Sequence, residues 1–109
     1  MSRINILKSF LETDPKDSFS RYAIALEYVK AGQHDDAARE FETVRTNDPD
    51  YVAAYFQLGK LYQQILRVHD AEKIFRTGIT VATKLKDEHT RSELEAALEE
   101  LLSNSGTDV

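Results

Sequence analysis

The stretch Tyr51–Phe75, YVAAYFQLGKLYQQILRVHDAEKIF, decides the fold because it repeats a pattern that the chain has already used once. In the second copy the pattern is carried by Tyr55, Leu58, Gly59, Tyr62, Ala71 and Phe75. In the first copy the corresponding residues, each 34 positions earlier, are Arg21, Ile24, Ala25, Tyr28, Ala37 and Phe41. The two Asp-Pro pairs, at 14–15 and 48–49, keep the same spacing. A fixed period of this length predicts stacked copies of one supersecondary unit.

Length and composition are those of an ordinary globular domain. The chain has 109 residues, enough for one domain, and 30% charged with 41% hydrophobic residues is typical of a soluble protein. The net charge of −5 and the scattered basic residues argue against a nucleic-acid partner. The sequence has no run of about 18 apolar residues and no apolar signal-peptide region, so no membrane partner is expected. The absence of cysteine excludes disulfides and thiolate metal sites, and the sequence predicts a cytoplasmic protein.

Hydrophobic periodicity predicts about six helices and no strand. The expected ranges are about 4–13, 19–31, 37–45, 51–65, 71–86 and 88–102. Asp17 is expected to cap the second helix, and Asp35 or Asp36 the third. Gly32 is expected to supply the left-handed residue that ends the second helix. The last residues, 104–109, are small and polar and are expected to form a flexible tail.

Two positions depart from a simple repetition of the first copy. Leu66 stands one period after Gly32, so the second hairpin turn lacks a glycine. We therefore expect either local backbone strain or a different type of turn there. Gly78 lies inside a predicted helix, where glycine costs about 1 kcal/mol relative to alanine. This cost indicates that Gly78 serves a close helix–helix contact.

The repeated pattern resembles the tetratricopeptide repeat signature W-x2-L-G-x2-Y…A-x3-F…P. The first copy keeps the closing proline at Pro49, whereas the second has Thr83 there. The resemblance covers residues 18–85 and implies a right-handed superhelical stack of helical hairpins, an all-α solenoid. It divides one domain, 1–103, into an N-terminal half-repeat helix (1–17), repeat 1 (18–51), repeat 2 (52–85) and a capping helix (87–103). The capping helix matches less well, because Leu98 or Glu95 stands where a small residue is expected.

The resemblance implies a non-catalytic protein–protein interaction module in which the first helix of each pair lines a concave groove. The groove candidates are Tyr22, Leu26, Val29, Lys30, Phe56, Gln57, Lys60, Gln63 and Gln64. Such a groove would hold a short peptide or a partner helix, with micromolar affinity or about 8 kcal/mol. In an alternative interpretation, a terminal helix covers Tyr22 and Leu26. The functional alternative is a structural scaffold whose exposed apolar residues meet another copy of the chain, giving a homo-oligomer.

Residues with catalytic or metal-binding chemistry occur in the chain, but their spacing does not suit that chemistry. His34, His69 and His89 are not three or four residues apart and no cysteine assists them, so no metal is expected. The sequence has no nucleophile motif and no phosphate-binding loop, so neither an enzyme activity nor a cofactor is expected. Some tetratricopeptide domains clamp a terminal carboxylate, but Tyr22 and Leu26 occupy the matching positions here. The glutamates of the last helix are expected to form a solvated face, with attraction of a basic partner as the alternative.

Overall fold

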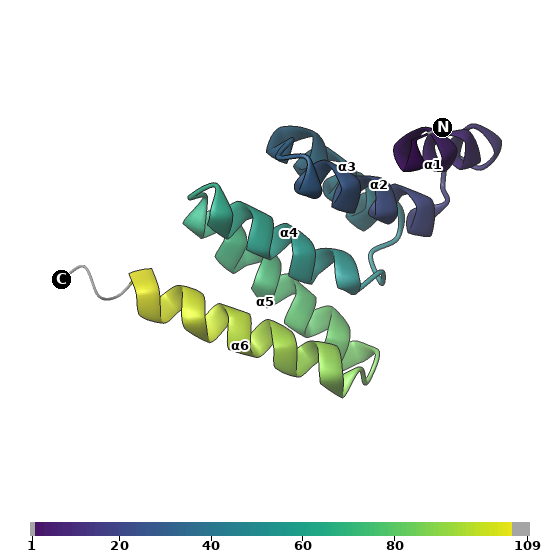
Figure 1. The fold of residues 1–109 in the computed structure, drawn as a ribbon. Coiled ribbons are helices and arrows are strands. Elements are labelled where there is room, and N and C mark those ends of the chain that lie inside the picture. Colours follow the sequence, from purple (N-terminus) through teal and green to yellow (C-terminus); the bar gives the residue numbers. More distant parts are fainter. Residues whose placement is uncertain (1, 106–109) are drawn as a thin grey trace. The chain divides into compact units, whose positions relative to one another are not determined.

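The computed structural model describes residues 2–105 and contains six α-helices, with no strand in that range (Figure 1). The helices are α1 (Arg3–Thr13), α2 (Ser18–Lys30), α3 (His34–Asn47), α4 (Ala53–Gln64), α5 (Val68–Lys84) and α6 (Glu88–Ser105). This architecture confirms the predicted all-α class and the pairing of consecutive helices into hairpins. The chain divides into two compact units, Met1–Tyr51 and Val52–Val109, so that each unit contributes three helices.

In the first unit, α2 packs against both α1 and α3. Leu7 of α1 forms a buried cluster with Ala23 and Ile24 of α2. Phe41 of α3 is fully buried, and the ring of Tyr22 on α2 meets it edge-on at a centroid distance of 5.8 Å. The apolar residues on two faces of α2 are therefore covered by two neighbouring helices, as the density of apolar residues in that segment predicts.

In the second unit, α4, α5 and α6 all contact one another, and Figure 1 shows α5 lying beside α6. Glycines mark the closest approaches. A Cβ at Gly78 of α5 would stand 2.7 Å from Cβ of Tyr55 on α4 and 3.1 Å from Cδ1 of Leu94 on α6. The three helices therefore converge at Gly78, which confirms that this helical glycine serves a close packing contact.

Each hairpin turn, and the turn between α5 and α6, ends its helix with the same Schellman hydrogen-bond pattern. A left-handed residue follows the helix end, and the next N–H donates to a carbonyl five residues back. These left-handed residues are Gly32 (φ 76°), Leu66 (φ 66°) and Lys86 (φ 59°). The corresponding N–H···O distances are 2.9, 2.8 and 2.9 Å. At Leu66 the chain therefore keeps the glycine-type turn and accepts backbone strain, which is one of the two predicted outcomes.

The predicted starts of three helices are wrong, and two of them are wrong for the same physical reason. The Schellman turn is so short that the next helix begins immediately, with Gln33 and Arg67 as N-cap residues and no side-chain cap hydrogen bond. α3 and α5 thus begin three residues before the predicted starts at Ala37 and Ala71. Asp35 and Asp36 lie in the first turn of α3, where the helix dipole favours carboxylates, and neither is the N-cap. α4 begins at Ala53 rather than at residue 51.

Aspartate caps begin α2 and α6. The carboxylate of Asp17 accepts the Ser20 N–H at 3.1 Å and the Ser20 hydroxyl at 2.6 Å, which confirms the predicted cap. The carboxylate of Asp87 does the same with Thr90, at 3.0 and 2.7 Å. α6 continues to Ser105, so residues 104 and 105 belong to the helix and not to the predicted tail. Residues 106–109 of that tail lie outside the described part of the chain.

Candidate functional site

The predicted groove residues lie on two helices that belong to different units. α2 carries Tyr22, Leu26, Val29 and Lys30, and α4 carries Phe56, Gln57, Lys60, Gln63 and Gln64. Each set is thus located within its own unit.

In the first unit, Tyr22 belongs to an aromatic cluster. Its ring lies 5.8 Å from that of Phe41 and 5.2 Å from that of Tyr51, measured between centroids. Burial raises the pKa of Tyr51, and the nearby Tyr22 and two aspartates raise it further. Leu26 and Val29 are half-buried, whereas Lys30 is exposed and its Nζ lies 3.7 Å from a carboxylate oxygen of Glu27. Tyr22 therefore contributes to the packing of the first unit, whether or not it also contacts a ligand.

In the second unit, Phe56 and Lys60 of α4 line a hollow together with residues of α6. The hollow has a volume of about 250 Å³, and its α6 side is formed by Glu93, Ala96, Ala97 and Glu100. Lys60 Nζ lies 5.9 Å from the centroid of the Phe56 ring, within the range of a cation–π contact. An apolar floor is thus bordered by one cation and by carboxylates.

A second hollow, of about 380 Å³, adjoins the first at Lys60 and is lined by Lys60, Gln63 and Gln64. We call the two hollows together the α4–α6 face. The glutamine amides add donors and acceptors of the kind that main-chain groups of a peptide need. Gln57 is half-buried and lines neither hollow. Four of the five predicted residues on α4 thus lie on one face.

Sequence reasoning missed the α6 side of this face. Glu93 and Glu100 were expected to belong to a solvated surface, and the sequence alone could not place them opposite Phe56. The repeat offers no guide to them, because it predicts which residues recur within each hairpin. It does not predict which side chains of α6 come to lie beside α4.

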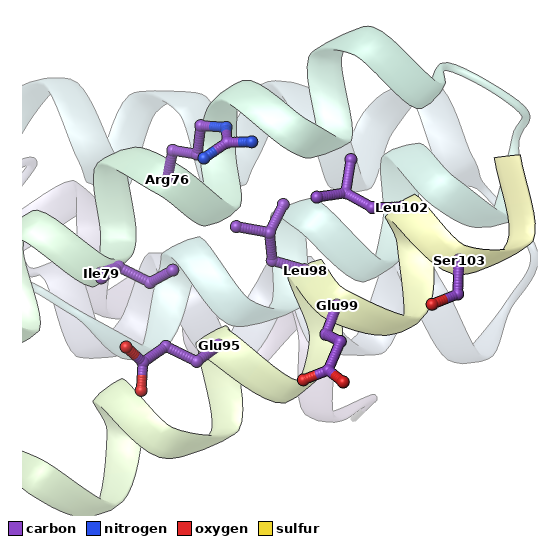
Figure 2. Close-up of a pocket in the computed structure, with 7 residues that line it drawn as sticks. All are labelled: Arg76, Ile79, Glu95, Leu98, Glu99, Leu102 and Ser103. Atoms are coloured by element: carbon purple, nitrogen blue, oxygen red, sulfur yellow. The ribbon is translucent and has the colours of Figure 1, made fainter. Parts of the chain in front are cut away.

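A larger groove lies on another side of α6, between α5 and α6 (Figure 2). We call it the α5–α6 groove. Its volume is about 570 Å³, and its lining consists of Arg76, Ile79, Glu95, Leu98, Glu99, Leu102 and Ser103. Figure 2 shows Ile79 and Leu98 pointing into the space between the two helices. The groove therefore has an apolar bottom and a charged rim.

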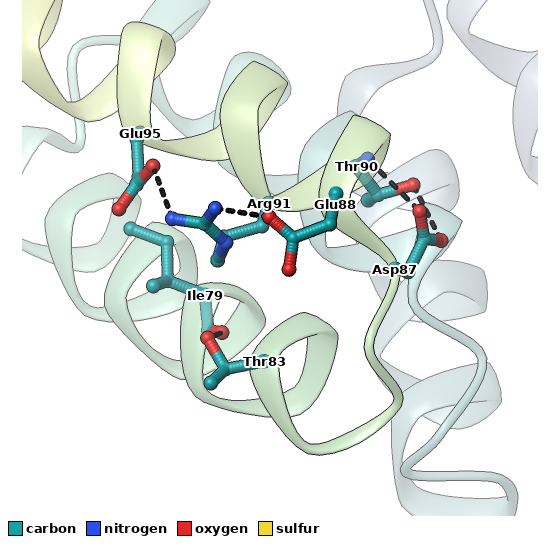
Figure 3. A network of polar contacts seen from close by, with 7 residues as sticks. All are labelled: Ile79, Thr83, Asp87, Glu88, Thr90, Arg91 and Glu95. Carbon is teal, nitrogen blue, oxygen red and sulfur yellow. Dashed lines mark hydrogen bonds and ion pairs between the residues drawn. The ribbon is translucent and has the colours of Figure 1, made fainter.

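An ion-pair network fixes one end of the α5–α6 groove (Figure 3). The Arg91 guanidinium binds Glu95 at 3.1 Å and also binds Glu88. The hydrogen bond and the charge of Glu88, with the charge of Glu95, raise the pKa of Arg91. Because Glu95 is engaged by Arg91, Glu99 is the rim carboxylate that no other described residue binds.

Residues 2–105 contain neither a metal-binding cluster nor a membrane-spanning helix. No group of three or more histidine, cysteine, aspartate or glutamate side chains is placed to hold a metal ion in that range. No helix described there is both long and apolar enough to cross a bilayer.

The repeat pattern recognised in the sequence has a counterpart among known families. A family model described as tetratricopeptide repeat matches residues 28–84. The chain belongs to this family. The tetratricopeptide repeat match covers most of both copies of the pattern, including the buried Phe41 and Phe75. No curated protein matches the chain.

Several solved structures share the fold of this chain. A tetratricopeptide repeat domain protein from Salinibacter ruber, solved by NMR, is 40% identical, with a TM-score of 0.77 over 81% of this chain and 89% of that chain. The TPR2B domain of yeast Sti1, in complex with pHsp70, is 13% identical, with a TM-score of 0.86 over 93% and 81%. PcrH, in complex with the chaperone binding region of PopD, is 16% identical, with a TM-score of 0.86 over 94% and 77%.

Proposed function

We propose that this tetratricopeptide repeat chain is a non-catalytic protein-interaction module that binds a peptide or a partner helix on the α4–α6 face. The observation that carries the proposal is the hollow in which Phe56 and Lys60 lie opposite Glu93 and Glu100. It combines apolar surface with charges of both signs, which suits a peptide or helix that carries both apolar and charged side chains. The chain acts within the cytoplasm in this proposal, as a single domain over residues 1–103.

Two structural neighbours support the class of function. The Sti1 domain is in complex with pHsp70, and PcrH is in complex with the chaperone binding region of PopD. Both neighbours are thus complexes with another protein, and both have the fold that this chain shares. Sequence identities of 13% and 16% support a shared fold but not a shared ligand. The ligand of this chain is therefore inferred from its own residues.

The α4–α6 face indicates the chemistry of the ligand. An apolar side chain fits against Phe56 and Ala97, and an acidic group fits beside Lys60. A basic group on the ligand fits beside Glu93 or Glu100. The side-chain amides of Gln63 and Gln64 can form hydrogen bonds with the main chain of an extended peptide. Tyr22, Leu26, Val29 and Lys30 remain candidates for contacts made by the first unit.

The test is selection of binding peptides from a random displayed library, followed by measurement of their affinity for variants of the chain. Phe56→Ala and Lys60→Ala are each expected to weaken binding at least about tenfold, or about 1.4 kcal/mol, as truncation of an interface anchor does. Phe56 is only half-buried and Lys60 is exposed, so both variants should keep their helical circular dichroism.

The matched control is Lys73→Ala, because Lys73 is an exposed lysine of α5 that lines neither hollow. This variant should bind the selected peptides with unchanged affinity. If Phe56→Ala and Lys60→Ala bind as tightly as the control, the α4–α6 face is not the binding site. Tyr22→Ala is a poorer test, because it also removes the contacts of Tyr22 with Phe41 and Tyr51.

A further inference from the structure

We propose that the α5–α6 groove receives helix α1 of a second copy of this chain, with Phe10 and Ile6 in the groove and Arg3 beside Glu99. This interaction uses a surface separate from the α4–α6 face and does not depend on peptide binding there. Through this contact the chain self-associates, because each copy can place its α1 in the groove of one neighbour and bind α1 of another neighbour in its own groove.

The groove side of the contact is apolar at the bottom and acidic at one rim. Leu98 and Leu102 are four residues apart on α6 and therefore lie on one stripe of the helix. Leu102 remains 40% exposed, and Ile79 of α5 faces the same space. Glu99 stands on the rim without a described partner among residues 2–105. The vacant volume of about 570 Å³ exceeds that of a phenylalanine side chain.

The helix side of the contact is an exposed edge of α1. Ile6 and Phe10 are also four residues apart, and they remain 41% and 50% exposed. Leu7, three residues before Phe10, is buried against α2, so Phe10 and Ile6 lie along the edge of the face that α1 packs within its own chain. Arg3 lies three residues before Ile6, on the same side of the helix. Its guanidinium is mostly exposed and stands 3.5 Å from Glu27, a surface pair that contributes little stability.

The two surfaces match in chemistry and in spacing. An i, i+4 pair on one helix fits beside an i, i+4 pair on another when their ridges and grooves interdigitate. The apolar pair of α1 would cover Leu98 and Leu102, and the charge of Arg3 would meet the unpartnered carboxylate of Glu99. A second copy is favoured over a foreign helix because α1 supplies both the apolar pair and the cation. Because the two surfaces differ, the contact is heterologous. In a pair of chains, α1 of one copy and the α5–α6 groove of the other therefore stay unoccupied.

The first experiment is sedimentation of the 109-residue chain from about ten micromolar to about one millimolar, a range that suits a weak interface. The average mass of the unaltered chain should rise with concentration. Phe10→Glu blocks the helix side and Leu102→Lys blocks the groove side, and each variant should remain a monomer. Phe19→Glu is the matched control, because Phe19 is the more exposed phenylalanine but lies on α2; it should associate like the unaltered chain.

Mixing the two blocked variants gives the decisive result. The Phe10→Glu chain still has an intact groove and the Leu102→Lys chain an intact α1, so the mixture should form a one-to-one dimer and nothing larger. In a separate test, Arg3→Glu should weaken association, and adding Glu99→Arg in the same chain should restore it. A monomeric unaltered chain, association that survives Phe10→Glu, or a mixture that stays monomeric would each overturn the proposal.

Discussion

The ring of Phe75 fills the space that a side chain at Gly59 would need. A Cβ at Gly59 of α4 would stand 2.3 Å from Cε1 of Phe75 on α5, closer than any real Cβ contact. Phe75 is completely buried, so its ring is enclosed by other residues. A small residue and an aromatic residue thus fit together where α4 meets α5, and both recur in the repeat.

Gly59→Ala should therefore destabilise the fold by about 1–3 kcal/mol, the cost of overpacking a filled core. This loss should appear even though alanine favours helix more than glycine does. Urea denaturation followed by circular dichroism measures it. Phe75→Leu provides the cross-check, because a smaller side chain makes room for the methyl group. The double variant should lose less stability than the sum of the two single losses, whereas additive losses would show that the contact is not the cause.

The strained turn at Leu66 gives a prediction of opposite sign. Leu66 has φ 66° and is 84% exposed, so its side chain contributes little packing to offset the backbone strain. Leu66→Gly should stabilise the chain by about 0.5–1 kcal/mol, because the strain relieved exceeds the extra entropy that glycine loses on folding. Leu66→Ala keeps the strain and should change stability little. Thermal and urea unfolding of both variants measure the difference.

Gly32 supplies the complementary test of the same turn. It has φ 76°, and a Cβ there would meet no atom within 4 Å, so a substitution adds backbone strain without a clash. Gly32→Ala should destabilise the chain by about 1 kcal/mol. Equal effects of alanine at Gly32 and at Leu66 would contradict the explanation, because only the first substitution introduces a side chain into the left-handed region.

The Asp17 cap predicts acid sensitivity. Hydrogen bonds from the Ser20 hydroxyl and then from the Ser20 N–H hold the pKa of Asp17 below its ordinary value of 3.8. The stabilisation by the ionised cap is complete above the unfolded-state pKa and is lost as the pH falls through the lower folded-state pKa. Asp17→Ala should cost about 1 kcal/mol at pH 7. This cost should shrink as the pH falls from about 4 toward 2.

Denaturation of the unaltered chain and of Asp17→Ala at several pH values measures this dependence. Ser20→Ala is the informative control, because it keeps the carboxylate and removes the hydroxyl that lowers its pKa most. The Asp17→Ala cost in that background should depend less on pH. A cost that is the same at pH 7 and pH 2 would mean that the charge of Asp17 does not contribute to the cap.

One packing contact of the fold could be predicted from a residue that is unfavourable inside a helix. Gly78 could be assigned to a close contact from its cost inside a helix, and the structure places Tyr55 and Leu94 against it. Helix starts could not be predicted equally well. The N-cap rule points to aspartates, but the short Schellman turns force the N-cap onto Gln33 and Arg67, which make no side-chain cap.

The candidate site could be predicted only on one side. The residues of α4 follow from the position of that helix as the first of a pair, and Phe56 and Lys60 do line a hollow. The positions of Glu93 and Glu100 on α6 depend on how three helices pack together. A repeat period in the sequence does not predict that packing. Whether the whole set binds a ligand remains a prediction.

The most direct test of the binding face is NMR of the isotope-labelled chain with a peptide selected for binding. The account predicts that the largest changes in amide chemical shift occur at Phe56, Lys60 and Glu93, with little change at Lys73 on the outside of α5. Largest changes at Ile79 and Leu98, with α4 unaffected, would place the peptide in the other groove and contradict the proposed binding face.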